Sequence, residues 1–242
     1  MARHRLGLVR QVLVGRPREL RPGCLSSLGR QPVERLSVEL DGVPGDACAD
    51  TRHHGGPEKA LHAYPFEHYS AWHALWPGAG LWRPGAFGEN LSTQGLDEAS
   101  QCIGDVLRIG SALVQVSQGR LPCWKLNIAF GQADMARRVQ DSGRMGWYLR
   151  VLQAGCIEAG DAIELLARPH PMWSLAKVQR CLFQRVHSAA ELAALAELPE
   201  LSPNWRERFA RRRDSGEVEA DPRRLLTPTE LGEARMPAPS PS

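Results

Sequence analysis

The sequence predicts a mainly β, α+β fold, in which a β-rich domain over residues 6–168 precedes a small three-helix unit over residues 170–225. Short apolar runs broken by Gly, Asp and Pro fill the first region, as is typical of the strands of a barrel or a sandwich. The apolar residues take helical spacing after position 171. A length of 242 residues fits one large domain with an appendage. The content of 43% hydrophobic and 24% charged residues excludes a disordered, collagen-like or coiled-coil chain.

The N-terminal segment is predicted to be the first strand. It reads MARHRLGLVRQVLVGRPREL, and its basic residues interrupt the apolar stretch, so it lacks the unbroken hydrophobic region of a secretory signal. An Arg-rich organelle transit peptide is the alternative interpretation. No apolar run approaches the roughly 18 residues that a membrane-spanning helix needs, so we expect no membrane association.

Two further stretches of the first region predict strands. Residues 106–117 are expected to form a hairpin that turns at Gly110 and Ser111. The tract at 159–166 repeats the turn-then-strand pattern of residues 103–109.

Two helices are expected to interrupt these strands. The first has Pro65 in its first turn, carries an aromatic stripe and stops at Pro77. The second covers residues 132–140, with Gly143 beyond its end.

The three-helix unit has its own signals. Leu175, Val178 and Leu182 repeat at helical spacing, and Ser188 with Glu191 forms a capping box before the second helix. A third helix opens at residue 203. A unit of about 45 residues has too little core of its own, so it is expected to pack on the main domain or on a partner. The Pro-rich tail over 226–242 is predicted to be disordered.

The cysteines indicate free thiols. The six stand at positions 24, 48, 102, 123, 156 and 181, with no two closer than 21 residues, so CxxC metal or redox pairs are absent. Six cysteines in 242 residues are too few for a disulfide scaffold. We therefore expect a reducing, cytoplasmic compartment.

The most informative segment surrounds Cys123, directly after a predicted strand. Arg120 precedes the thiol by three residues and Lys125 follows it by two. Cationic neighbours stabilise the thiolate, which is the form that attacks as a nucleophile or binds a metal. The alternative is that Cys123 is a small buried hydrophobic residue.

The segment RHHGGPEKAL at 52–61 offers a glycine loop. Backbone N–H groups at Gly55 and Gly56 can approach a ligand closely, and Lys59 adds positive charge that suits a phosphate. Zinc is the rival ligand, because five histidines fall between residues 53 and 73. His68 and His73, however, are roughly 140° apart on a helix and cannot easily share a metal.

Two weaker segments and one charge run complete the candidates. The segment FGENLS places Glu89 and Asn90 in a tight turn, and SGRMGWY holds Arg144 between glycines. The arginines at 206–213 could bind nucleic acid, but the net charge of only +3 favours a solvated helix face.

Four of these segments occur in the order RHHGGPEKALHAYPFEHY, FGENLST, IGDVLRIGSALVQVSQGRLPC followed by KLN, and SGRMGWYLRVL. Together they resemble the MOSC family, the molybdenum-cofactor sulfurase C-terminal domain, and in particular its YiiM-like bacterial branch. That branch gives resistance to N-hydroxylated bases such as 6-hydroxylaminopurine and carries a three-α domain after MOSC. The resemblance spans residues 6 to about 225 and implies a closed β-barrel with a pocket for the molybdenum cofactor, a molybdopterin.

By this resemblance Cys123 is the molybdenum ligand and the catalytic residue. The implied reaction is the two-electron reduction of an N-hydroxylated small molecule, such as an amidoxime, to an amine or amidine, which is a detoxification. The electrons are expected from a separate electron-donor reductase, because the chain has no flavin or Fe–S cysteine pattern. The residues in matching motifs that could hold the cofactor are His54, Gly55, Gly56, Lys59, Asn90, Arg120, Lys125 and Arg144.

The sequence departs from the family pattern at one position. Gly119 stands where this branch often has proline, which is expected to loosen the loop that carries Cys123.

In one alternative function, Cys123 holds a persulfide as a sulfur carrier in the assembly of a metal–sulfur cofactor. In the other, the chain is an interaction module whose Arg-rich helix binds nucleic acid.

Overall fold

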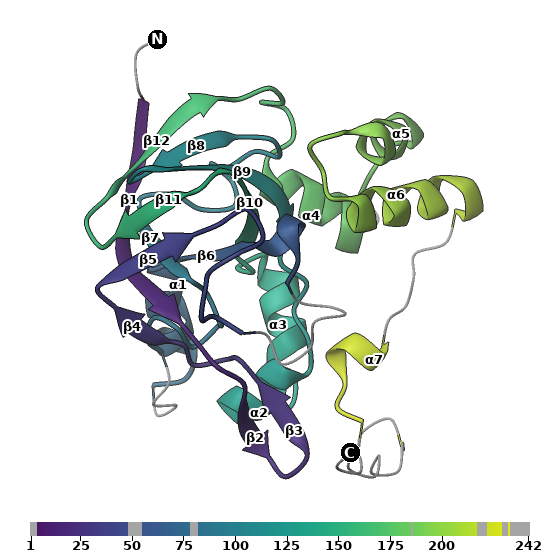
Figure 1. The fold of residues 1–242 in the computed structure, drawn as a ribbon. Helices are drawn as coiled ribbons and strands as arrows, with labels where there is room; N and C mark the ends of the chain where they lie inside the picture. Colours follow the sequence, from purple (N-terminus) through teal and green to yellow (C-terminus); the bar gives the residue numbers. More distant parts are fainter. Residues whose placement is uncertain are drawn as a thin grey trace, which may run out of the picture.

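The strands of the first 167 residues close into a barrel, and the helices that follow pack beside it (Figure 1). This arrangement, in a computed structural model, confirms the mainly β, α+β class with a closed barrel and a helical appendage. The structure describes residues 4–47, 55–77, 82–184, 186–216, 222–228 and 232.

Seven strands form the closed ring within the described part of the chain. In ring order they are β1 (His4–Val14), β12 (Ala162–Ala167), β8 (Val106–Ile109), β9 (Ala112–Gly119), β10 (Trp147–Gln153), β6 (Leu61–Pro65) and β7 (Leu91–Gln94), which returns to β1. Neighbours in the ring are antiparallel, except that β6 and β7 run parallel.

The ring closes because β1 pairs with strands on both of its sides. Residues 4–8 pair with β12 and residues 8–12 with β7, and the register shifts on both sides of the strand. Such irregularities bend a strand and help a sheet to close. Gly7 permits a close approach of β1 to β7, since a Cβ there would lie 2.2 Å from the Gln94 carbonyl oxygen.

Shorter strands extend the barrel. They are β4 (Gln31–Val33) on β1, the antiparallel pair β5 (Arg35–Val38) and β11 (Gly155–Glu158), and the hairpin of β2 (Arg18–Arg21) and β3 (Cys24–Ser26).

The predicted strands are confirmed at three places. The basic N-terminal stretch forms β1, and the expected hairpin forms β8 and β9 with Gly110 in the left-handed region at φ 56°. The two turn-then-strand tracts become β8 and β12, which pair with each other in antiparallel register.

The helices within the barrel domain differ in detail from the prediction. Helix α1 (Glu67–Leu75) begins after Pro65, which belongs to β6, and α3 (Met135–Ser142) begins three residues later than expected. Gly143 ends α3 in the left-handed conformation, as its position predicts. Helix α2 (Lys125–Phe130) was not predicted, because its six residues are too few to show a helical period.

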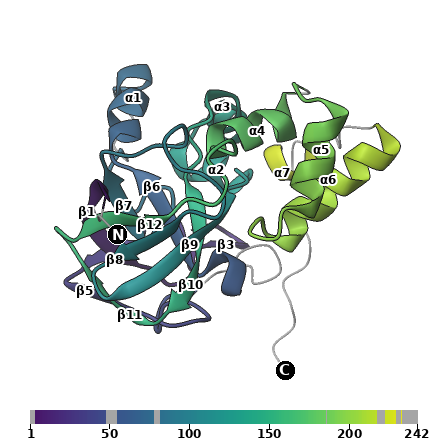
Figure 2. The same cartoon turned by 90° about the horizontal axis from the view of Figure 1, so that it is seen from above.

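The C-terminal helices pack on the barrel, as their small size predicts (Figure 2). They are α4 (Leu175–Phe183), α5 (Ala189–Glu197) and α6 (Pro203–Ser215), and α5 begins with the predicted capping box of Ser188 and Glu191. Trp205 and Phe209 on α6 are fully buried and belong to the same hydrophobic core as the barrel interior. Full burial of a side chain like Phe209 stabilises the contact by about 1.5–3 kcal/mol.

A second hydrophobic core lies under α1, α2 and α3. It contains Tyr64, Trp72, Phe87 and Phe130, and the Phe87 ring stacks on Tyr64 and meets the rings of Trp72 and Phe130 at a tilt. A short helix near the C-terminus, α7 (Pro222–Leu225), contributes Leu225 to the same core.

The predicted disordered tail over 226–242 falls mostly outside the described residues. Of its described part, Thr227 is buried. Among the described residues, no helix combines the length and the apolar character needed to cross a membrane.

Candidate functional site

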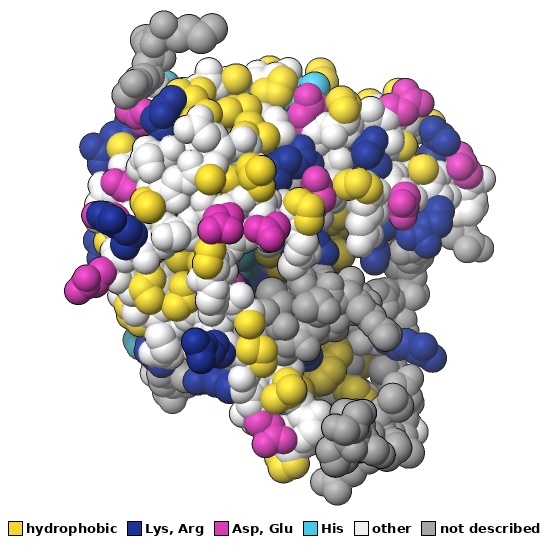
Figure 3. All heavy atoms as spheres, viewed as in Figure 1, with side chains coloured by type: hydrophobic (Ala, Val, Ile, Leu, Met, Phe, Trp, Pro, Cys, Tyr) yellow, Lys and Arg dark blue, Asp and Glu magenta, His cyan; other side chains and the backbone are white. Residues whose placement is uncertain are grey.

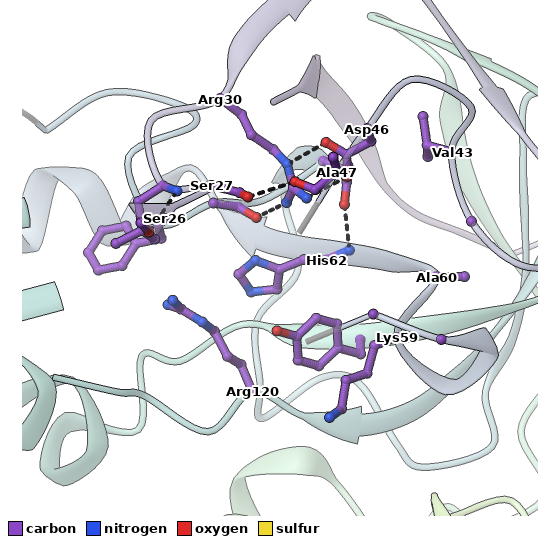
Figure 4. Close-up of a pocket in the computed structure, with 18 of the residues that line it drawn as sticks. Ser26, Ser27, Arg30, Val43, Asp46, Ala47, Lys59, Ala60, His62 and Arg120 are labelled. Carbon is purple, nitrogen blue, oxygen red and sulfur yellow. Dashed lines mark hydrogen bonds and ion pairs between the residues drawn. The ribbon is translucent and has the colours of Figure 1, made fainter. Parts of the chain in front are cut away.

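A cavity of about 610 Å³ brings most of the predicted site residues together (Figure 4). Its walls come from the segment after β3, the loop of residues 39–47 after β5, the start of β6, and the stretch between β9 and α2. The predicted residues that line it are Gly55, Gly56, Lys59, Asn90, Arg120, Cys123 and Lys125.

Two predicted residues are not placed in this cavity. His54 lies outside the described residues. Arg144 is not among the residues that line the cavity: its guanidinium carbon lies 5.8 Å from the centre of the Trp72 ring, in the second hydrophobic core. Flanking glycines do not decide where an arginine points, and here the aromatic face attracts the cation.

The thiol of Cys123 is half-buried at the cavity wall. Its loop leaves the end of β9 and enters α2, where the Leu126 N–H donates to the Cys123 carbonyl at 2.9 Å. The N–H of Arg120 donates to the Gly146 carbonyl at 3.1 Å, which ties the start of the loop to the turn before β10. Cys123 thus shares one cavity with three cationic side chains, those of Lys59, Arg120 and Lys125.

Gly119, which departs from the family pattern, lies where the end of β9 meets the helical unit. A Cβ at Gly119 would lie 3.0 Å from Gln179 Nε2 and 3.1 Å from Trp205 Cη2. The missing side chain therefore lets α4 and α6 pack closely against the end of β9. The close contact with the helical unit restrains this end of the loop.

Arg120 presents an unpartnered nitrogen to the cavity, and His62 lies beside it. Arg120 is 4% exposed and His62 is 2% exposed, and Figure 4 shows both side chains directed toward the same space. Arg120 Nη1 makes no hydrogen bond within the described part of the chain, whereas the His62 ring is bonded by the backbone of Gly88 and Met145. Burial of a polar group without a partner is costly, so the Arg120 nitrogen favours a ligand with oxygen acceptors.

His62 is held neutral by its surroundings. Burial lowers the pKa of His62 well below its usual 6.5, and the positive charge of Arg120 lowers it further. A neutral imidazole carries one N–H donor and one acceptor nitrogen. The pair therefore places one permanent cation beside one neutral ring.

A buried ion pair forms the opposite wall. Arg30, which is 6% exposed, donates from Nε to Asp46 Oδ1 at 3.0 Å and from Nη2 to Asp46 Oδ2 at 2.5 Å. Its Nη1 also donates to the Gly88 carbonyl. Asp46 neutralises Arg30, so this guanidinium shapes the wall of the cavity rather than offering a free charge.

The side-chain amide of Asn90 lies at the cavity, and its hydrogen bonds are made within the protein. Its Oδ1 accepts from the His62 N–H at 3.1 Å, and its Nδ2 donates to Asp46 Oδ2 at 3.1 Å and to the Leu13 carbonyl at 3.3 Å. Asn90 thus positions His62 and the buried ion pair, a role that the motif alone did not indicate.

Side chains of β9 and β10 hold the segment that follows the glycine loop. Gly55 and Gly56 have φ of 101° and 83°, a conformation that glycine adopts without strain, before the short helix η1 (Pro57–Lys59). Glu58 in η1 is bonded by the Arg150 guanidinium, and its carbonyl accepts from Ser117 Oγ at 2.6 Å. These contacts place Lys59 at the cavity, as Figure 4 shows.

Sequence reasoning missed Arg30 and Asp46, and considered His62 only as a zinc ligand. Nothing local marks Arg30 and Asp46, which stand 16 residues apart. The zinc alternative finds no support in the described part of the chain, where no group of three or more His, Cys, Asp or Glu side chains could hold a metal. His68 instead bonds the buried Glu98, with 2.8 Å between Nε2 and Oε2.

The arginine run of α6 does not form a continuous basic face. Arg212 is buried and donates to the Cys181 carbonyl at 2.6 Å, and Arg213 lies 2.7 Å from Asp214 and 3.8 Å from Glu197. Figure 3 shows acidic and basic side chains interspersed over the helical unit. This distribution agrees with a solvated helix face better than with a nucleic-acid surface.

Comparison with known families finds two matches along the chain. Residues 50–164 match the model of the MOSC domain, and residues 173–216 match the model of the YiiM-like, 3-alpha helix domain. The first match contains all the predicted site residues, and the second covers α4, α5 and α6 in full.

The chain is also similar to individual proteins. It is 42% identical over 191 residues to YflK, an uncharacterized protein of Bacillus subtilis (strain 168), across 76% of this chain and 83% of that protein. A protein of Gibberella moniliformis named reductase is 43% identical over 160 residues, which are 65% of this chain and 28% of that protein. The crystal structure of YiiM from Escherichia coli superposes with a TM-score of 0.76 at 32% identity, covering 90% of this chain and 98% of that one.

Proposed function

This chain belongs to the MOSC family and carries the YiiM-like three-helix domain, and on that premise we propose that it is a molybdenum-cofactor-dependent oxidoreductase. Its proposed reaction is the reduction of N-hydroxylated small molecules, such as 6-hydroxylaminopurine or amidoximes, to amines or amidines. The similarity to a fungal protein named reductase agrees with redox chemistry.

The observation that carries the proposal is that one cavity holds a thiol and an unpartnered buried cationic donor. Cys123 offers a soft sulfur ligand of the kind that suits a thiophilic metal. Arg120 Nη1 lacks a partner in the described residues, so it can donate to a phosphate oxygen of a pterin cofactor. The volume of about 610 Å³ lies in the usual range for small-molecule and cofactor sites.

The residues present therefore fit the cofactor. Cys123 would ligate the molybdenum, while Arg120, His62, Lys59 and Lys125 would neutralise and bond the anionic end of the pterin. The bound cofactor would supply the two-electron redox chemistry that cleavage of an N–O bond requires. Arg144 has no place in this assignment, because it does not line the cavity.

The remaining residues prepare the cavity for that ligand. Asn90 and the Arg30–Asp46 pair hold the wall that carries His62, so the donors keep their positions before the ligand binds. The neutral His62 lies beside Arg120 without adding a second buried charge. Electrons would have to come from a separate electron-donor protein, because no two of the six cysteines stand close enough in sequence for an Fe–S motif.

The test compares the wild-type chain with Cys123→Ser, both produced in a host that makes the cofactor. We expect the wild type to retain molybdenum and to reduce 6-hydroxylaminopurine with a chemical or protein electron donor. The Cys123→Ser variant should keep the fold and lose both properties. A wild-type chain that holds no molybdenum and carries removable sulfane sulfur on Cys123 would overturn the proposal in favour of a sulfur carrier.

A further inference from the structure

The C-terminal segment after the three-helix unit returns to the loop that carries Cys123. In this segment, the described residues 222–228 comprise α7 and three residues beyond it. The N–H of Trp124 donates to the Arg224 carbonyl at 2.7 Å. The Arg224 side chain donates from Nη1 to the Pro122 carbonyl at 2.5 Å. A single residue near the C-terminus therefore bonds the backbone on both sides of Cys123.

Further contacts anchor the segment to the helices beneath the loop. Asn127 Nδ2 donates to the Leu225 carbonyl at 2.9 Å, and Asn127 Oδ1 accepts from the Ala136 N–H at 2.8 Å. Arg224 also donates to Gln140 Oε1, which lies on α3. These bonds join the segment to both α2 and α3.

Hydrophobic packing supports the same attachment. Leu225 is 8% exposed within the second hydrophobic core, and the Arg224 guanidinium lies 5.6 Å from the centre of the Phe183 ring on α4. The segment thus contacts the Cys123 loop, the helices below it and the first helix of the three-helix unit. We call residues 222–228 the C-terminal clasp.

We propose that Arg224 is a positioning residue for Cys123, acting through the backbone of Pro122 and Trp124. Pro122 has no N–H, so its carbonyl is the backbone group through which the loop can be bonded at that position. Between Arg120 and the first turn of α2, the clasp supplies the bonds that flank the thiol. The need for a fixed sulfur position rests on the proposed function, because a metal ligand must be held to within about 0.5 Å.

The experiment measures the reactivity of individual thiols in the full chain, purified from a host that lacks the cofactor. Iodoacetamide labelling is followed by peptide mass spectrometry at Cys123 and at Cys156, the other half-buried thiol of the described residues. Arg224→Ala removes the side-chain bonds and keeps a residue that favours a helix. We expect labelling of Cys123 to become about tenfold faster while labelling of Cys156 stays unchanged, because the loop opens locally.

Two further variants separate positioning from general destabilisation. Arg223→Ala changes the exposed neighbour on the same helix and should behave as the wild type. Arg224→Lys keeps a cationic donor and should restore part of the slow labelling at Cys123. Equal acceleration of both thiols in Arg224→Ala, or no acceleration at either, would overturn the proposal.

A parallel preparation from a cofactor-producing host links this result to the proposed function. There Arg224→Ala should retain less molybdenum than the wild type, and Arg223→Ala should retain as much. A wild-type chain without molybdenum would count against the proposed function alone, since the thiol labelling is read without cofactor.

Discussion

Replacing Arg120 with Met should stabilise the empty protein while weakening its affinity for an anion. Arg120 is 4% exposed, and its Nη1 has no partner among the described residues. An unsatisfied buried donor costs on the order of 1–3 kcal/mol, and more when it is charged. Methionine keeps much of the packing of the arginine stem, so we expect a net gain of about 1 kcal/mol. For a chain of this size that gain raises the Tm by about 2–4 °C.

The effect on ligand binding has the opposite sign. A hydrogen bond to a charged group contributes about 1.5–3 kcal/mol, which corresponds to a loss of about 10- to 150-fold in affinity. Thermal unfolding at increasing concentrations of inorganic phosphate measures both quantities in one assay, because a ligand of the native state raises the Tm with its concentration. The Tm without phosphate reports the stability of the empty protein, and the rise of the Tm with phosphate concentration reports the apparent Kd.

Arg144→Met is the matched control, since Arg144 lies over Trp72 and does not line the cavity. Its phosphate affinity should equal that of the wild type. The reasoning fails if Arg120→Met lowers the Tm of the empty protein and leaves phosphate affinity unchanged. That result would mean that the guanidinium is satisfied within the protein and does not serve a ligand.

Three further predictions concern pH, charge and packing. His62 is neutral when folded, with a pKa held below 6.5, so the unfolded chain binds a proton that the folded chain does not, and stability should fall as pH drops below about 6.5. Urea midpoints between pH 7.5 and 5.5 should show a shallower decline in His62→Gln, and identical declines would contradict this assignment. Lys59→Glu should reduce molybdenum retention whereas Arg144→Glu should not; metal analysis of the two purified variants decides, and equal losses would argue against the cavity as the binding site. Trp205→Ala should cost about 3–5 kcal/mol, because its side chain is fully buried between α6 and the barrel, and an unchanged urea midpoint would count against that packing.

The sequence by itself determined the elements whose signals are local. Alternation and turn residues predicted the hairpin of β8 and β9, and the capping box predicted the start of α5, because these signals act over a few residues. The motifs also indicated that Gly55, Lys59, Arg120, Cys123 and Lys125 belong to one site, and the structure places all five at one cavity.

Contacts between distant segments were decided only by the tertiary structure. Asn90 and Arg144 stand in similar short motifs, yet one is bonded inside the frame of the cavity and the other packs on Trp72. The pair of Arg30 and Asp46 likewise depends on how two loops meet, which no local pattern records.

The contacts of the C-terminal clasp also could not be predicted from the sequence. Arg224 bonds the carbonyl of Pro122, which is 102 residues away in the chain. A hydrogen bond over that separation depends on the closed barrel, the docking of α4 to α6 and the return of the chain to α2. Local residue preferences determine which segments become strands and helices, whereas the burial of shared surfaces determines which distant side chains meet.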